Sequence, residues 1–274
     1  MLLYGFLQEL RMAVFDLENV VQRHDAVFLD TGAFGQMPFP VEVFSPQEVE
    51  RYRADLRVVE GALSVLRDER YAGRFFITPY IHDEAMRFAD GIGADLRVLH
   101  TYFRRSVPKR HRLPGKRGGH GHSSRGIIPL QEGHALARAQ GDYASSLADI
   151  TRIYGAFQTV LGELSVYKFP HAVDDPSGKP SQADASLVLS MLHYAGNNPE
   201  KKSAAATGDV DIVRLYVRFV KERKVESSVY DRTKVFLYVP RDHHVLELPY
   251  ERSVELLNSP LSSRKIAQPS SGMS

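Results

Sequence analysis

Short apolar runs alternate with longer amphipathic segments along much of this chain, and the alternation limits the possible folds more than any other feature. The predicted strands are AVFLD at 26–30, RFFIT at 74–78, SAAAT at 203–207 and KVFLYVP at 234–240. Segments with helical periodicity separate them. Strands that alternate with helices build βαβ units. We therefore predict an α/β fold, a three-layer α/β/α sandwich around a mainly parallel central sheet.

The predicted helices carry recognisable start and stop signals. The segment 45–73 begins with Ser45 as N-cap, Pro46 at the first helical position and Glu48 completing a capping box, and Gly73 follows its end. The other predicted helices are 79–90, 132–165, 181–196 (capped by Ser181 and closed by Gly196) and 211–224. Two short strands are also predicted, one at 166–169 and an edge strand at 243–248. These elements place one domain at 26–250, followed by a Ser- and Pro-rich tail at 260–274 that we expect to fray.

The N-terminal residues 1–25 show a helical stripe in which apolar side chains recur at steps of three and four: Leu3, Phe6, Leu10, Ala13, Leu17 and Val20. We expect this helix to pack on the protein's own domain. A dimer seam is less favoured, because the stripe is shorter than the several heptads of a coiled coil. Acidic and basic residues interrupt the segment, so it resembles neither a signal peptide nor a membrane span, and we expect a cytoplasmic protein.

Composition narrows the possible chemistry. The chain of 274 residues has no cysteine, which excludes disulfides, thiolate zinc sites and thiol nucleophiles and fits a reducing compartment. Any catalysis must therefore use oxygen or nitrogen groups.

One segment, 104–126, is strongly basic although the net charge of the whole chain is only +2. It has no acidic residue, is rich in Gly, Pro, His and Ser, and is predicted to be a long flexible insertion. Lys and Arg bind phosphates without sequence preference, so we expect this insertion to hold RNA. Its eight cationic residues are Arg104, Arg105, Lys109, Arg110, Arg112, Lys116, Arg117 and Arg125.

Acidic side chains follow the ends of the predicted strands, where ligands bind in parallel sheets. They are Asp30, Glu84, Asp184, Asp209 and Asp211. Taken singly, each is explained by helix capping or by the helix dipole. Held together, they would raise one another's pKa unless a cation neutralised them. Mg²⁺ prefers such oxygen ligands, and two such ions can activate a water and stabilise the leaving oxygen of a phosphodiester.

Four fragments carry a resemblance to a known family. In order, VFLDTGAF, ITPYIHDEA, ADASLVLSMLHYA and AATGDVDIVRL resemble the successive acidic motifs of the PIN domain family of metal-dependent nucleases. The family pattern is a strand ending in Asp followed by Thr or Ser, a Thr-Pro leading to a Glu, an Asp beginning a helix, and a Thr-x-Asp-x-Asp turn. The match spans the chain from Asp30 to Leu215.

The resemblance implies a ribonuclease that hydrolyses single-stranded or structured RNA at a Mg²⁺ or Mn²⁺ centre. The chain is longer than the compact toxins of the family, which argues against a toxin role. Its metal ligands would be Asp30, Asp184 and Asp209, completed by Glu84, with Asp211 as the fifth acid. Thr31 and Thr207 would orient a ligand, a water or the scissile phosphate. Glu60 is a rival to Glu84, but it lies inside a long predicted helix.

Two alternatives accompany the nuclease interpretation. A non-catalytic PIN-like protein would bind RNA through the basic insertion or act as a scaffold, with the acids serving as caps. A haloacid dehalogenase-like phosphatase also begins with an Asp after a strand, but it requires Asp-x-Asp where this chain has Asp30, Thr31 and Gly32. A homodimer and a regulatory protein partner are both compatible with the sequence.

Overall fold

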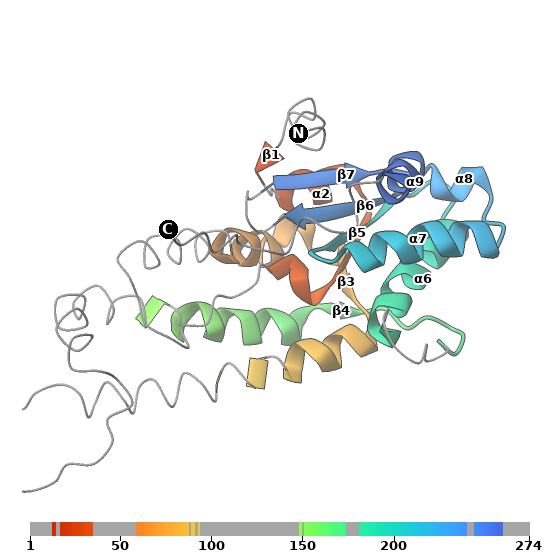
Figure 1. Ribbon diagram of the computed structural model, residues 1–274. Coiled ribbons are helices and arrows are strands. Elements are labelled where there is room, and N and C mark those ends of the chain that lie inside the picture. The colour runs from red at the N-terminus through yellow and green to blue at the C-terminus, as the bar shows by residue number, and fades with distance from the viewer. Residues whose placement is uncertain are drawn as a thin grey trace, which may run out of the picture.

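The computed structural model describes residues 13–14, 17–34, 59–87, 89–90, 93, 148–149, 151–173, 181–239 and 244–259. Within them a seven-stranded sheet has the order β1-β7-β6-β5-β2-β3-β4 (Figure 1). Its strands are β1 (Ala13–Val14), β2 (Ala26–Leu29), β3 (Phe75–Ile77), β4 (Ser165–Val166), β5 (Ser203–Thr207), β6 (Thr233–Val239) and β7 (His244–Leu248).

The sheet is mostly parallel, as the sequence predicts. Adjacent strands are parallel along the row β6-β5-β2-β3-β4. Strand β7 is antiparallel to β6, and β1 is antiparallel to β7. All residues of β2 and β5 are buried, which explains why both read as unbroken runs of apolar or small residues. The mixed α/β class is therefore confirmed.

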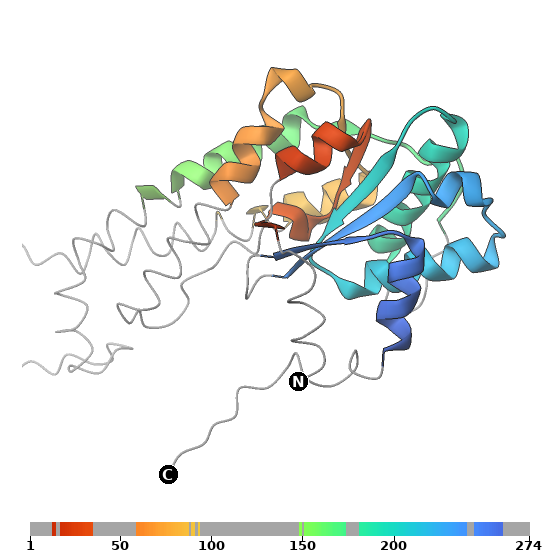
Figure 2. The same cartoon turned by 90° about the horizontal axis from the view of Figure 1, so that it is seen from above.

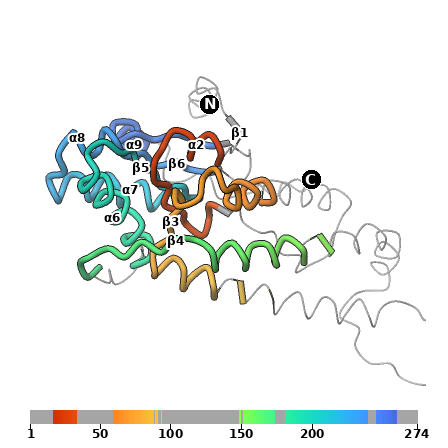
Figure 3. Tube along the Cα trace, turned by 180° about the vertical axis from the view of Figure 1, so that it is seen from behind, coloured from red at the N-terminus to blue at the C-terminus, as the bar shows by residue number. Residues whose placement is uncertain are grey.

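Helices cover both sides of this sheet. Figure 2 shows α7 (Val210–Glu222) and α9 (Tyr250–Asn258) on one side, and α2 (Leu17–Arg23) and the helix at 59–66 on the other. The helices at 79–87 and 151–163 lie toward the β4 edge, whereas α9 lies toward the β7 edge (Figure 3). This layering fits an α/β sandwich.

The predicted N-terminal helix is correct only in part. Leu17 and Val20 are buried on α2 as expected, but Ala13 belongs to β1, where it pairs with Val245 of β7. The prediction of helix at Ala13 was wrong because pairing with a distant strand decides the local structure there. Residues 1–12 lie outside the described residues. None of the described helices is long and apolar enough to cross a membrane.

The predicted helix 45–73 stops early. The described part is helical over 59–66, and Asp68 then caps a separate 3₁₀ turn, η2 (Glu69–Tyr71), by accepting from the backbone nitrogen of Arg70. Asp competes with helical hydrogen bonds in this way, so one continuous helix was a wrong prediction. Gly73 has a φ of +77°, as suits a glycine after a turn. The start signals Ser45, Pro46 and Glu48 lie outside the described residues.

The helices that lead away from the parallel strands agree better with the sequence. Helix α6 (Gln182–Asn197) has the Ser181 cap, and it passes through Gly196 to end one residue later. Helix α7 begins after the N-cap Asp209. A helix begins at Pro79 and covers 79–87, as predicted. Residues 151–163 are helical and lie within the predicted segment 132–165.

Three features at the C-terminal end differ from the expectation. Strand β7 is not an edge strand, because β1 pairs with its outer side. Helices α8 (Ser227–Tyr230) and α9 were not predicted, and neither has a side-chain cap hydrogen bond that could have signalled its start. Helix α9 contacts the fold through Tyr250, whose ring lies 6.1 Å from that of Tyr216 and 4.7 Å from that of Tyr230.

Candidate functional site

Asp30 lies directly after β2 and is the most buried acid of the candidate site, with 7% of its surface exposed. Its Oδ1 accepts from the backbone nitrogen of Thr31 at 2.7 Å, and its Oδ2 accepts from Oγ1 of Thr207 at 2.7 Å. Burial raises the pKa of the Asp30 carboxyl to about 6, although both hydrogen bonds oppose the rise. The folded protein thus holds a carboxyl that costs free energy to ionise.

Thr207 connects the ends of two neighbouring strands. Parallel pairing aligns Leu29 of β2 with Ala206 of β5, so the next residues, Asp30 and Thr207, meet at the carboxyl edge of the sheet. The Thr207 hydroxyl donates to Asp30 and accepts from the backbone nitrogen of Asp209 at 2.9 Å. One side chain therefore fixes two of the predicted acidic segments relative to each other.

Gly32 allows the loop after β2 to approach Gly208 in the loop after β5 closely. A Cβ added to Gly32, in the 3₁₀ turn η1 (Thr31–Phe34), would lie 2.9 Å from the backbone nitrogen of Gly208 and 3.2 Å from Oδ2 of Asp30. Position 32 therefore has no room for a side chain. This is the position at which a haloacid dehalogenase-like phosphatase needs its second acid, so the packing disfavours that alternative.

Asp184 occupies the third position of α6, in a capping box with Ser181. Its Oδ2 accepts from the backbone nitrogen of Ser181 at 2.8 Å, and its own backbone nitrogen donates to the Ser181 hydroxyl at 3.2 Å. Burial raises the pKa of the Asp184 carboxyl, and the negative charges of Asp209 and Asp211 raise it further. Asp184 in turn raises the pKa of Asp30, so it interacts with acids on both neighbouring strand ends.

Glu84 joins this cluster from the helix at 79–87. Partial burial raises the pKa of its carboxyl, Asp184 raises it further, and Arg87 opposes the shift. The N-terminus of that helix contacts α6 through a hydrogen bond between the hydroxyls of Thr78 and Ser186, which are 2.6 Å apart. Glu84 and Asp184 thus come from two helices whose relative position is fixed by a buried contact.

Asp209 and Asp211 have local partners as well. Oδ1 of Asp209 accepts from the backbone nitrogen of Asp211 at 2.8 Å and so caps α7. Oδ1 of Asp211 pairs with Nη1 of Arg214 at 2.5 Å. Capping and ion pairing account for these two acids singly, and their negative charges also raise the pKa of Asp184.

The structure therefore brings the predicted acids to one edge of the sheet but does not arrange them as a finished metal shell. In the part of the chain that is described, no three His, Asp or Glu side chains are grouped closely enough to hold a metal ion. Glu60, the rival to Glu84, instead pairs with Arg152 at 2.5 Å. The basic insertion 104–126 lies outside the described residues.

Sequence reasoning missed the residues that support the acids. Thr78 and Ser186 join the two helices, and Gly32 allows its loop to pack closely against Gly208. The glycines had a signal, since each stands directly after a threonine at a strand end. Oγ1 of Thr31 is buried without a hydrogen-bond partner among the described residues.

Comparisons of the chain with protein-family models, with curated proteins and with solved structures found no match.

Proposed function

We propose that this protein is a PIN-like ribonuclease that uses Mg²⁺ or Mn²⁺ at the acidic edge of its sheet. The observation that supports the proposal is the convergence of acids from separate segments. Asp30 follows β2, Glu84 lies on the helix after β3, and Asp184 opens α6. Asp184 raises the pKa of both Asp30 and Glu84, and Glu84 raises the pKa of Asp30, which supports a shared region for the three carboxyls.

A cation would remove the electrostatic cost of this arrangement. An acid that is 7% exposed and adjacent to other acids destabilises the fold whenever it is ionised. Strongly perturbed carboxyls of this kind concentrate at functional sites. The chemistry of the donors, which are all carboxylate or hydroxyl oxygens, fits a hard divalent ion.

Asp30, Asp184 and Asp209 would hold the ion, with Glu84 beside them. Among the described residues, none donates to Oδ1 of Asp184 or to Oδ2 of Asp209, so each retains an oxygen for a ligand. Asp211 is the least available of the five, because Arg214 neutralises it. A bound divalent ion would supply positive charge to the phosphate and polarise a water.

Thr207 and Thr31 would serve as positioning residues. Both donate to Asp30, one through its hydroxyl and the other through its backbone nitrogen, and so set the direction of the carboxylate. The basic insertion would bring RNA to an edge that, by its charge, repels phosphate.

Cleavage of labelled single-stranded RNA tests this function. We expect cleavage with Mn²⁺ or Mg²⁺, none in EDTA, and a loss of about 100-fold or more in Asp30→Asn and Asp209→Asn. Asp25→Asn is the matched control, because Asp25 lies at the opposite end of β2 and accepts only from the backbone nitrogen of Lys202 among the described residues. Cleavage that persists in EDTA, or that survives in Asp30→Asn, would refute the proposal.

A non-catalytic RNA-binding or scaffold role is the second candidate. It is favoured by the local roles of Asp184 and Asp209 as helix caps and by the ion pair of Asp211. RNA binding without metal-dependent cleavage in the same experiment would support it over the nuclease.

A further inference from the structure

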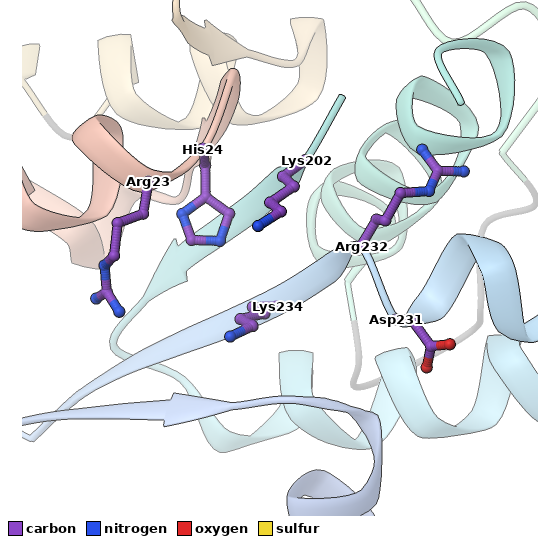
Figure 4. Close-up of a pocket in the computed structure, with 6 residues that line it drawn as sticks. All are labelled: Arg23, His24, Lys202, Asp231, Arg232 and Lys234. Carbon is purple, nitrogen blue, oxygen red and sulfur yellow. The ribbon is translucent and has the colours of Figure 1, made fainter. Parts of the chain in front are cut away.

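A pocket of about 290 Å³ lies at the edge of the sheet opposite the acids. His24 precedes β2, Lys202 precedes β5 and Arg232 precedes β6, so the pocket sits at the amino ends of three adjacent parallel strands. Its lining residues, shown in Figure 4, are Arg23, His24, Lys202, Asp231, Arg232 and Lys234. Four of these six carry a permanent positive charge.

Carboxylates neutralise only part of this charge. Glu247 pairs with Arg23 at 2.9 Å and also with Lys234. Asp231 lines the pocket, but its carboxylate points away from Lys202 and Lys234 (Figure 4). Within the described residues, neither Lys202 nor Arg232 forms an ion pair with a carboxylate, although the Asp25 carboxylate accepts from the Lys202 backbone nitrogen.

The guanidinium of Arg232 is fixed in place by backbone carbonyls. Its Nη1 donates to the carbonyls of Asn198 and Lys201 at 2.7 and 3.0 Å, and its Nε donates to that of Ser228 at 2.6 Å. The guanidinium therefore points away from Lys202 and Lys234 (Figure 4). Arg232 adds positive charge near the pocket, but it is not placed to share one anion with the two lysines.

His24 forms the buried wall of the pocket, with 4% of its surface exposed. Its Nδ1 donates to the Val20 carbonyl at 2.8 Å, since a carbonyl can only accept, and its ring packs edge-on against Phe236. Burial lowers the pKa of His24, and the charges of Lys234 and Arg23 lower it further, while the Val20 hydrogen bond and Glu247 oppose the change. The neutral ring leaves Nε2 free of its proton.

We propose that this pocket binds a phosphate group through Lys202 and Lys234. The two lysines come from the starts of neighbouring strands and lie beside the His24 ring (Figure 4), which suits a compact anion with several acceptor oxygens. Lys202 has no carboxylate partner among the described residues, and Lys234 shares Glu247 with Arg23, so an anion would complete the local charge balance. The phosphate could belong to a free mononucleotide or to an RNA chain, and the chemistry of recognition is shared.

Titration with inorganic phosphate, observed by NMR of the histidine ring protons, tests the pocket. The protein is kept in EDTA at constant ionic strength, and the His24 signal is assigned by its loss in His24→Gln. We expect a saturable shift of this signal at millimolar phosphate and a rise in the pKa of His24, because an anion offsets the nearby positive charges. EDTA makes the result independent of the metal-dependent activity proposed for the opposite edge.

A pair of neighbouring lysines provides a matched comparison. Lys202→Gln should weaken phosphate binding about tenfold, the usual effect of losing one charge-assisted hydrogen bond. Lys201→Gln should leave it unchanged, because the Lys201 ammonium lies 6.0 Å from the Tyr194 ring centre and does not line the pocket. Lys202 is exposed, so its substitution should not disturb folding.

Three ligands then identify the source of the phosphate: inorganic phosphate, adenosine monophosphate, and a short RNA with or without a 5′-phosphate. Binding that Lys202→Gln weakens and Lys201→Gln preserves supports the pocket, whichever phosphate binds most tightly. No saturable His24 shift with any ligand, or equal weakening by the two lysine substitutions, would overturn it.

Discussion

Asp30 combines burial with two hydrogen bonds, and its ionisation is linked to the stability of the fold. Its carboxyl pKa rises from 3.8 to about 6 on folding, so the folded state retains a proton that the unfolded state has lost between these values. The contribution of Asp30 to the free energy of unfolding is therefore most favourable below about pH 4, and it is lost as the pH rises through about 6. Above that pH, the ionised carboxylate costs about 3 kcal/mol.

Asp30→Asn should for this reason stabilise the metal-free protein at neutral pH. In EDTA at about pH 7.5, we expect the free energy of unfolding to increase by about 1–2 kcal/mol, since the removed charge penalty exceeds the cost of one altered hydrogen bond. The difference should vanish near pH 4. Urea unfolding at both pH values measures it, and a variant less stable than wild type at the higher pH would contradict the burial penalty.

Gly32 tests the close approach of the two loops. Gly32→Ala places a Cβ 2.9 Å from the backbone nitrogen of Gly208, so the loops must separate, at a cost of about 1–3 kcal/mol. Gly61→Ala is the control, because no heavy atom lies within 4 Å of its added Cβ and Ala favours the helix there by up to about 1 kcal/mol. Thermal unfolding distinguishes the pair, and equal effects would argue against a tight junction.

At the level of elements, the hydrogen bond between Thr78 and Ser186 links the helix at 79–87 to α6. Thr78→Val keeps the shape of the side chain but removes this bond and the one from the Ile81 backbone nitrogen. We expect a decrease of about 1–3 kcal/mol in the free energy of unfolding.

Thr159→Val is the matched control for this element. The Thr159 hydroxyl donates to the Gly155 carbonyl of its own helix, and its side chain is exposed, so the change should stay within about 0.5 kcal/mol. Urea unfolding compares the two variants. If both lose the same stability, the hydrogen bond between the helices has no special role.

The sequence predicted elements whose signals are local. Strand β5 lies between a lysine pair and a Thr-Gly turn, and α6 begins with a capping box that four consecutive residues define. Ala13 in β1 could not be predicted, because its partner Val245 is far away in the chain. The break at Asp68 was missed because the helical pattern continues past it, and only the cap geometry ends the helix.

In the candidate site, too, the features with local signals were predictable and those that depend on distant residues were not. That Asp30 and Asp209 lie at strand ends could be read from the sequence, but their proximity depends on β2 and β5 being neighbours, which the sheet order provides. The hydroxyl of Thr207 between them could not be foreseen as a bridge. Local patterns identify the chemical groups, and the topology decides which of them meet.

Across the whole molecule, the parallel sheet separates charge between its two edges. Asp30, Asp184 and Asp209 gather at the carboxyl ends of the strands, whereas Lys202 and Arg232 gather at the amino ends. An RNA substrate would be repelled by the first edge until cations neutralise it. Under the proposed function, the affinity for RNA must therefore come from another part of the chain, and the basic insertion at 104–126 supplies it.

Neutralising five residues of that insertion to Gln tests its role in RNA binding. The variant replaces Arg104, Arg105, Lys109, Arg110 and Arg112. RNA affinity should decrease, and the slope of log affinity against log salt should fall by about 0.7 for each phosphate that is no longer neutralised. Fluorescence anisotropy at several salt concentrations measures both. An unchanged slope would show that the insertion does not bind RNA.

Binding of Mn²⁺ itself, followed by the electron paramagnetic resonance signal of the free ion, bears on the acidic edge without assuming any substrate. Wild-type protein and Asp25→Asn should bind Mn²⁺ equally, whereas Asp30→Asn and Asp184→Asn should bind it at least about tenfold more weakly. If wild-type protein removes no Mn²⁺ from solution, or if all four proteins bind it alike, the acids at the carboxyl edge do not form a metal site.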